Sequence, residues 1–243
     1  MCRKKRSIGI MLRSYIAFDV ETTGLNPQEN EIIEIGALKV RDGRVAERFM
    51  EFIQPSAPLA PAITNLTGIT DEMLSGARPR CSVIADFLDF CEDDFLIGHN
   101  VIFDYSFMKC SASAENLPFE KSGIDTLKIA QKVHKDLPSK SLGSLCDYYH
   151  IENRSAHRAY HDALATAKLY QTLAHHFEEQ DPKLFKPVQL TYKIKKPQPA
   201  TPKQLALLSN LIRKTKAEVT WDTKTLTRSE ASRIIERLLK NRT

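Results

Sequence analysis

The sequence predicts an α/β fold in which helices cover a mixed sheet, followed by a small C-terminal helical module. Three observations predict it. Strand-like segments come first and are joined by tight turns, and later strand-like segments alternate with amphipathic helical ones. A proline-rich stretch over residues 181–200 then separates this body from two short segments that each begin with a helix capping box.

The composition is that of an ordinary soluble globular protein. The chain has 243 residues, of which 42% are hydrophobic and 27% are charged, so it has room for one domain of about 150–200 residues and a small appendage. Five scattered cysteines without a CxxC pair indicate reduced thiols rather than a disulfide framework or a zinc site. Because no segment approaches the ~18 apolar residues of a membrane span, we expect a cytoplasmic protein with no membrane partner.

Charge divides the chain into an acidic body with basic ends. Residues 15–180 contain 15 lysines and arginines against 25 aspartates and glutamates, whereas residues 181–243 contain 15 against 5. The first fourteen residues add five further positive charges. This split suits a body that binds metal and ends that hold a polyanion. For the C-terminal part, solvated faces on a small helical unit are the alternative.

The first three predicted strands form an antiparallel meander. An apolar, β-branched run predicts a buried strand over residues 15–20, and a second strand is expected over 32–40. An Asp-Gly pair then predicts a hairpin turn, after which a third strand covers 44–53. Prolines break the chain beyond it, and a short helix is expected over 60–66.

Helices then alternate with short strands along the rest of the body. Their predicted bounds are a helix over 82–90, a strand over 95–98, a helix from about 101, a strand over 122–125, and helices ending near 134, over 141–149 and over 159–178. We therefore divide the chain into a basic N-terminal extension (1–13), the α/β body (14–180), a proline-rich linker with a brief extended piece (181–200) and a small basic helix–loop–helix module (201–243).

Two acids end the first predicted strand. Asp19 and Glu21 are two positions apart, so their side chains project from the same side of the strand. Neighbouring carboxylates at the edge of a core repel each other and resist desolvation, and a hard divalent cation such as Mg²⁺ would relieve both penalties. The alternative is an exposed strand end with two solvated acids.

Two further acids lie beside apolar stripes on predicted helices. Asp104 shares a helical face with Phe107 and Met108, where a lone carboxylate is costly unless it is paired. Asp162 lies in the first turn of the longest predicted helix, where the helix dipole alone also favours an acid. Because these acids lie on separate elements, only a fold that brings them together makes them a site.

The segments that carry these acids resemble the three motifs of the DnaQ-like family of DEDDh 3′→5′ exonucleases. They are Asp19-Val20-Glu21-Thr22-Thr23-Gly24, then His99-Asn100 followed by Phe103-Asp104, then His157 with Ala159, Asp162 and Ala163. The family includes the proofreading subunit of bacterial DNA polymerase III and the exonuclease region of PolC polymerases. The resemblance spans about residues 14–178 and implies a ribonuclease H-like, mixed five-stranded sheet flanked by helices, with 14–180 as the exonuclease domain.

The resemblance implies a two-metal hydrolase. Two Mg²⁺ or Mn²⁺ ions held by the four acids Asp19, Glu21, Asp104 and Asp162 would stabilise the attacking and leaving oxygens of a phosphodiester. His157, five residues before Asp162 as the DEDDh pattern requires, is the expected general base, because an ordinary histidine pKa lies near neutrality. Five residues of continuous helix would turn this side chain off the face of Asp162, so His157 must precede the helix. A surface histidine is the alternative.

The resemblance also implies a set of residues that bind the terminal nucleotide: Thr22, Thr23, Gly24, Leu25, Asn100 and Phe103. The first three form a turn whose backbone amides would face the 3′ end. The leucine and the phenylalanine would pack against the last base, with ordinary core packing as the alternative for both. His161 is expected to face away from the site, and His99 is expected to be a structural residue or a loop contact.

These inferences predict a metal-dependent 3′→5′ exonuclease that releases nucleoside 5′-monophosphates from a single-stranded or frayed end. DNA is the expected substrate, in proofreading or repair, and a DNA polymerase is a candidate partner. The alternatives are an RNA-trimming exoribonuclease or oligoribonuclease, and a catalytically weak nucleic-acid-binding scaffold. Lysines and arginines of the C-terminal module would add phosphate contacts, while Trp221 is expected to pack between its helices rather than stack on a base.

Overall fold

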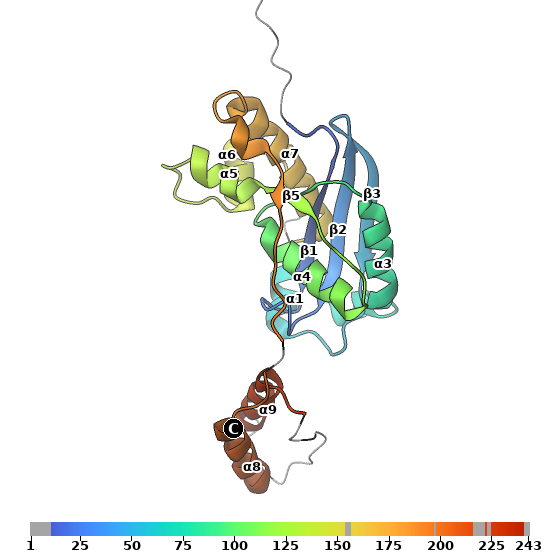
Figure 1. The fold of residues 1–243 in the computed structure, drawn as a ribbon, viewed down its shortest axis with the longest axis vertical. Helices are drawn as coiled ribbons and strands as arrows, with labels where there is room; N and C mark the ends of the chain where they lie inside the picture. The colour runs from blue at the N-terminus through green and yellow to red at the C-terminus, as the bar shows by residue number, and fades with distance from the viewer. Residues whose placement is uncertain (1–10, 154–156, 197, 216–221, 223–224, 241–243) are drawn as a thin grey trace, which may run out of the picture. The chain divides into compact units, whose positions relative to one another are not determined.

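The computed structural model describes residues 11–153, 157–196, 198–215, 222 and 225–240 (Figure 1). Most of the predicted N-terminal extension, and Trp221, lie outside the described residues. The chain divides into two compact units, the first ending at Tyr192 and the second beginning at Lys193. Each unit is described below by itself.

A mixed six-stranded sheet with strand order β3-β2-β1-β4-β5-β6 organises the first unit. The strands are β1 (Tyr15–Thr22), β2 (Ile32–Arg41), β3 (Arg44–Phe52), β4 (Leu96–Gly98), β5 (Ser122–Asp125) and β6 (Val188–Gln189). Strands β1 to β3 form the predicted antiparallel meander, while β4 pairs parallel with β1 and β5 parallel with β4. The sheet has one strand more than the five predicted, because the brief extended piece pairs antiparallel with β5 as β6.

The helices expected from the sequence form in the first unit together with the brief α2, and their capping residues explain where several begin. They are α1 (Pro61–Thr67), α2 (Asp71–Leu74), α3 (Arg80–Cys91), α4 (Val101–Ala114), α5 (Thr126–Val133), α6 (Leu142–Tyr149) and α7 (Ala159–Phe177). Side chains of Thr70, Asp125 and Ser141 accept backbone N–H groups at the starts of α2, α5 and α6. A short 3-10 helix, η1 (Pro182–Phe185), was not predicted. None of the helices in the described ranges is long and apolar enough to span a membrane.

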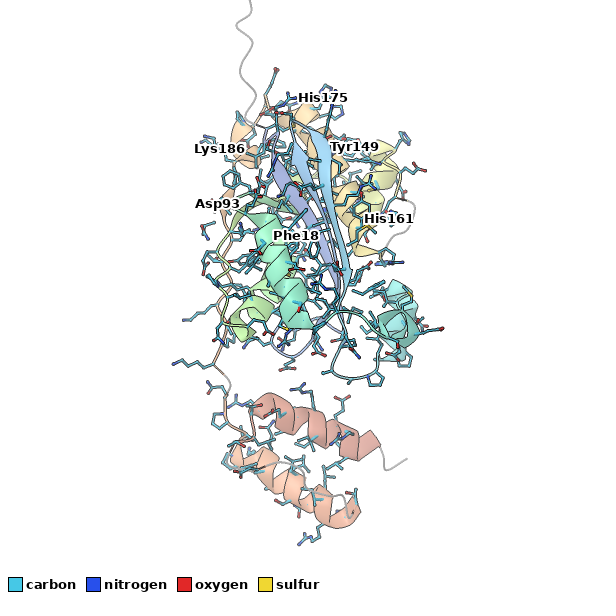
Figure 2. All side chains as sticks on the ribbon, turned by 90° about the vertical axis from the view of Figure 1, so that its right-hand side faces the viewer. Phe18, Asp93, Tyr149, His161, His175 and Lys186 are labelled. Atoms are coloured by element: carbon cyan, nitrogen blue, oxygen red, sulfur yellow. The ribbon has the colours of Figure 1, made fainter. Side chains whose placement is uncertain are left out.

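Helices cover both faces of the sheet (Figure 1). The even-numbered residues from Ile16 to Val20 of β1 pack with α3 and α4, and Phe18 is labelled in this layer in Figure 2. The odd-numbered Tyr15 and Ala17 pack with α5, α6 and α7 on the opposite face. This alternation follows from the two-residue period of a strand. Asp19 and Glu21 continue the odd-numbered row, so β1 directs them to the side of α7.

A glycine on β2 lets the start of α7 approach the sheet. A Cβ atom on Gly36 would lie 1.9 Å from the backbone nitrogen of Tyr160 and 2.1 Å from the carbonyl carbon of Ala159. Any larger residue would therefore displace the helix start. Gly36 pairs with Asp19 in the β1–β2 register, so the first turn of α7 lies next to the acids of β1.

The second unit is a pair of capped helices, α8 (Pro202–Thr215) and α9 (Arg228–Lys240). Both predicted capping boxes form, since Thr201 and Gln204 exchange hydrogen bonds at the first helix and Thr227 and Glu230 do so at the second. Alanine and leucine side chains form the core of this unit: Ala200, Leu208, Leu211, Leu226, Ala231 and Leu238.

Candidate active site

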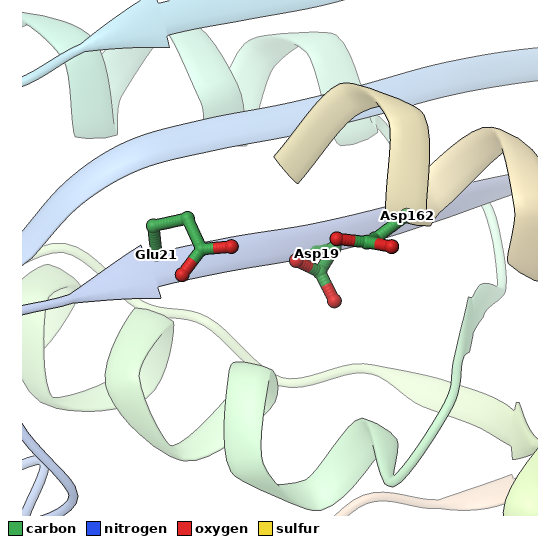
Figure 3. A group of neighbouring side chains, drawn as sticks. All are labelled: Asp19, Glu21 and Asp162. Carbon is green, nitrogen blue, oxygen red and sulfur yellow. The ribbon is translucent and has the colours of Figure 1, made fainter. Parts of the chain in front are cut away.

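The four predicted acids line one pocket of about 520 Å³. Asp19 and Glu21 come from β1, Asp104 from the first turn of α4, and Asp162 from the first turn of α7. One carboxylate oxygen from each of Asp19, Glu21 and Asp162 lies within 4.8 Å of the other two. Figure 3 shows Asp162 on its helix next to the two acids of the strand. Elements far apart in the sequence therefore bring the acids together.

Asp104 enters the pocket from the α4 side and completes the hydrogen bonding of β1. Its Oδ1 accepts a hydrogen bond of 3.1 Å from the backbone N–H of Val20. Strand β4 pairs with β1 only at Ile16 and Ala17. The backbone N–H of Val20 lies beyond this pairing, so the side chain of Asp104 provides its acceptor. Asp104 is only 3% exposed, as its apolar neighbours in the sequence indicate.

Burial and mutual repulsion disfavour ionisation of these carboxyl groups. Burial, followed by the charges of Asp104, Asp162 and Glu21, raises the pKa of Asp19 well above its ordinary value. Burial also raises the pKa of Asp104, against the opposing effect of the N–H group of Val20. For Glu21, burial and then the charge of Asp162 raise the pKa from 4.5 to about 7. Hard divalent cations fit this set of oxygen donors, because they offset both desolvation and repulsion.

His157 lies in the segment that leads into α7, where the motif spacing requires it. The helix begins at Ala159, and His157 adopts a left-handed backbone conformation with φ of 65°, which is uncommon for a residue other than glycine. Its backbone N–H donates to Oδ2 of Asp162 at 2.8 Å. His157 lines the pocket with the four acids, whereas His161 is not among the lining residues.

An ion pair between the buried Glu34 and the half-buried Arg158, not identified from the sequence, holds the start of α7. Nε and Nη2 of Arg158 donate to the carboxylate of Glu34 at 3.2 and 3.0 Å. The same carboxylate accepts the backbone N–H of Ala159 at 3.2 Å, so an acid on β2 caps the helix. Glu34 also pairs with Glu21 in the strand register. Glu34 stands out in the sequence as a charged residue inside an apolar strand, but the sequence did not indicate that Arg158 is its partner.

Asn153 is a second residue that sequence reasoning missed. Its Nδ2 donates to Oδ1 of Asp162 at 2.8 Å, while Oδ2 of the same carboxylate accepts the N–H of His157. Both oxygens of Asp162 are therefore oriented by neighbours from the segment before α7. That segment has no hydrophobic periodicity, so the sequence contained no signal for this position.

The predicted nucleotide-binding residues fall into two groups. Asn100 and Phe103 line the pocket, and Phe103 also packs against the α3–α4 core. The turn over residues 22–25 lies outside the pocket lining, and the N–H of Thr23 donates to the carbonyl of Glu31 at 2.9 Å. That amide, predicted to face the 3′ end, is thus engaged within its own loop. Leu25 is 84% exposed, which excludes core packing for this side chain.

His99 has a structural role, one of the two expected for it. Its Nδ1 lies 2.9 Å from the hydroxyl of Thr126 and its Nε2 lies 2.9 Å from the carbonyl oxygen of Lys140. Burial lowers the pKa of His99. With both ring nitrogens engaged, this imidazole joins the end of β4 to the start of α5 and to the loop before α6.

This fold gathers carboxylates at the end of its first strand, an arrangement suited to divalent cations. The chain belongs to the exonuclease family RNase_T, which matches residues 16–170, and the predicted DnaQ-like resemblance is confirmed. It is 41% identical over 157 residues to the DNA polymerase III PolC-type of Streptococcus pyogenes serotype M18 (strain MGAS8232), and equally to that of serotype M1. The match covers 64% of this chain and 11% of each relative.

Solved structures of exonuclease I share the fold. One, on how exonuclease I achieves processivity, has a TM-score of 0.62 at 20% identity and covers 72% of this chain and 42% of that one. Another, E. coli exonuclease I in complex with a dA16 oligonucleotide, has a TM-score of 0.61 at 19% identity with the same coverage. The chain therefore spans less than half of these proteins and a small part of the PolC-type relatives.

Proposed function

We propose that this chain is a metal-dependent 3′→5′ exonuclease that releases nucleoside 5′-monophosphates, with DNA as its substrate in proofreading or repair. The observation that carries the proposal is the convergence of four acids and one imidazole on a single pocket: Asp19, Glu21, Asp104, His157 and Asp162. The oligonucleotide bound in the exonuclease I complex supports a single-stranded substrate. The polymerase named in the PolC-type relatives supports a DNA polymerase as partner.

The carboxyl groups of the pocket fit two Mg²⁺ or Mn²⁺ ions. Asp19, Glu21 and Asp162 would hold one ion, because an oxygen of each lies within 4.8 Å of the others. Asp19 and Asp104 would hold the second. When bound, the ions supply positive charge that stabilises the attacking and leaving oxygens of a phosphodiester.

The remaining pocket residues would move the proton and hold the nucleotide. His157 takes a proton from the attacking water, and its backbone hydrogen bond to Asp162 keeps it beside the acids. Phe103, in the pocket wall, provides an aromatic face for the terminal base. Asn100 lies in the same wall and would bind near the phosphate. Leu25 and the turn formed by Thr22, Thr23 and Gly24 would approach the nucleotide from outside the pocket.

A labelled oligonucleotide tests the proposal. With Mg²⁺, a single-stranded DNA labelled at its 5′ end should shorten stepwise from the 3′ end and release nucleoside 5′-monophosphates, and a chelator should stop the reaction. Asp19→Asn should lower the rate by at least about 10³-fold, since the lost charge stabilisation amounts to several kcal/mol. Asp89→Asn, at an exposed position of α3, is the matched control and should keep the wild-type rate.

Two results would refute the assignment: full-rate cleavage by Asp19→Asn, or shortening from the 5′ end. The same assay on an RNA of identical sequence separates a DNA exonuclease from an RNA-trimming enzyme, which would prefer the RNA. Equal oligonucleotide binding with and without Mg²⁺, together with no cleavage, would instead indicate a nucleic-acid-binding scaffold.

The C-terminal module over residues 201–243, joined by the linker over 181–200, is proposed to add phosphate contacts on long substrates. Residues 181–243 carry 15 basic against 5 acidic residues. The apolar sides of α8 and α9 meet in their own small core, and Lys203, Arg213 and Lys214 of α8 are exposed, where a polyanion can reach them. Such contacts are independent of sequence and weaken as salt increases.

A further inference from the structure

A second pocket, of about 450 Å³, lies between α4, α5, β5 and the segment from η1 to β6. Apolar side chains form much of its lining, including Ile102, Ile129 and Val188. Four exposed lysines line it as well: Lys128 and Lys132 on α5, Lys183 on η1, and Lys186 just before β6. We call this pocket the lysine groove. Figure 2 shows Lys186 at the outer margin of the first unit.

The lysine groove is positively charged although the surrounding body is acidic. Residues 15–180 carry 25 acidic against 15 basic residues. In the part of the chain that the structure describes, none of the four ammonium groups takes part in an ion pair. Asp125, the acid of the lining, directs Oδ1 to the backbone N–H groups of Asn100 and Leu127. The charge of the lysines therefore faces solvent and favours an anionic ligand.

The lysine groove borders the candidate active site across one helical turn. Val101 and Ile102, at the start of α4, line the groove, whereas Asn100 and Phe103 line the active-site pocket. A hydrogen bond of 2.9 Å from the N–H of Asn100 to Asp125 joins the two walls. A linear polyanion with its end in the active-site pocket needs to cross only this turn to reach the lysines.

We propose that the lysine groove binds the backbone phosphates of a nucleic acid strand upstream of the 3′ end held in the active-site pocket. Lysines make phosphate contacts that do not depend on sequence, as an enzyme that shortens a strand residue by residue requires. The apolar lining offers a surface for sugars and bases. The direction of the strand rests on the proposed function, whereas binding of the polyanion rests on the charge and shape of the groove alone.

Binding and cleavage, measured separately, test this inference on the full chain. Anisotropy of a labelled 12-nucleotide single-stranded DNA in chelator reports binding without cleavage. The double variants Lys128→Glu/Lys132→Glu and Lys183→Glu/Lys186→Glu should each weaken binding about tenfold at 50 mM salt. Each should also reduce the slope of log affinity against log salt by about 1.4, the value for two lost phosphate contacts on a single strand. Cleavage of a dinucleotide, too short to reach the groove, should keep the wild-type rate.

The control is Lys135→Glu/Lys168→Glu, which makes the same charge change at exposed lysines outside both pockets. Groove variants that bind the oligonucleotide like this control would overturn the inference. The inference would also be overturned if the groove substitutions weakened binding of a labelled poly-glutamate but not of the oligonucleotide, because the ligand would then be an acidic peptide. Failure of the wild-type chain to cleave, with binding that still depends on the groove lysines, would overturn the proposed function and leave the groove assignment supported.

Discussion

The two units of this chain differ in whether they bury charged side chains. Among its described residues, the first unit buries the titratable side chains Glu34, Lys39, Asp104, Asp125 and Asp162. In the second unit, the buried residues among those described are alanines and leucines. Buried charge costs stability unless a partner or an ion compensates it. The first unit therefore depends on hydrogen bonds and ion pairs that compensate its buried charge, as at Asp125, Glu34 and Lys39, whereas the described core of the second unit is apolar.

The sharpest test of this contrast compares two neighbouring histidines. His157→Asn should lower the rate of cleavage by about 10²–10⁴-fold, the usual contribution of a general base. His161→Asn, outside the pocket lining, should change the rate little. The rates on a labelled oligonucleotide at saturating Mg²⁺ measure both. Equal losses in the two variants would remove His157 from the role of base.

Breaking the ion pair between Glu34 and Arg158 should have the next largest effect, here on stability. Glu34→Ala leaves the guanidinium of Arg158 and the N–H of Ala159 without their acceptor, so we expect a loss of about 3 kcal/mol in the free energy of unfolding. Glu34→Gln keeps an acceptor for both donors, so its free energy of unfolding should decrease less. Urea unfolding measures the two variants, and Glu72→Ala, at an exposed position of α2, is the control. Equal stability of Glu34→Ala and wild type would contradict the capping role.

The raised pKa of Glu21 predicts how the stability of the metal-free protein depends on pH. Burial holds this pKa at about 7 instead of 4.5, so the folded state binds the proton more tightly than the unfolded state. The resulting stabilisation is fully present below pH 4.5 and is lost as pH rises through about 7. The loss amounts to at most about 3 kcal/mol.

Thermal unfolding in chelator between pH 4.5 and 8 measures this dependence. Glu21→Gln should make it less steep, with the contributions of Asp19 and Asp104 remaining, while Glu179→Gln, an exposed control beyond α7, should follow the wild type. Added Mg²⁺ should restore stability at pH 8 in the wild type more than in Glu21→Gln, because the ion replaces the lost proton as the compensating charge. Identical pH curves for Glu21→Gln and wild type would show that another group causes the dependence.

The smallest expected effect on cleavage comes from the second unit. Removing a buried leucine typically costs about 2–5 kcal/mol, which is comparable to the whole stability of so small a unit. Leu208→Ala should therefore unfold α8 and α9, as hydrogen exchange would report, yet leave cleavage of a dinucleotide unchanged. A loss of dinucleotide cleavage would show that the two units depend on each other.

The sequence by itself determined the features that depend on neighbouring residues. The hairpin of β2 and β3, both capping boxes of the second unit and the paired acids Asp19 and Glu21 follow from local periodicity and turn chemistry. The position of His157 ahead of α7 also follows from spacing along the chain. These features were predicted because each depends on residues that are a few positions apart.

Only the tertiary structure decided which distant residues complete the site. The ion pair of Arg158 with Glu34 and the sixth strand join segments that lie far apart in the sequence, and the hydrogen bond from Asn153 to Asp162 spans nine residues without a periodic pattern. The β1–β2 register and the close contact at Gly36 place the start of α7 beside Glu34. The ion pair and the sixth strand are non-local, so their stabilisation appears only after the sheet and its helices have packed together.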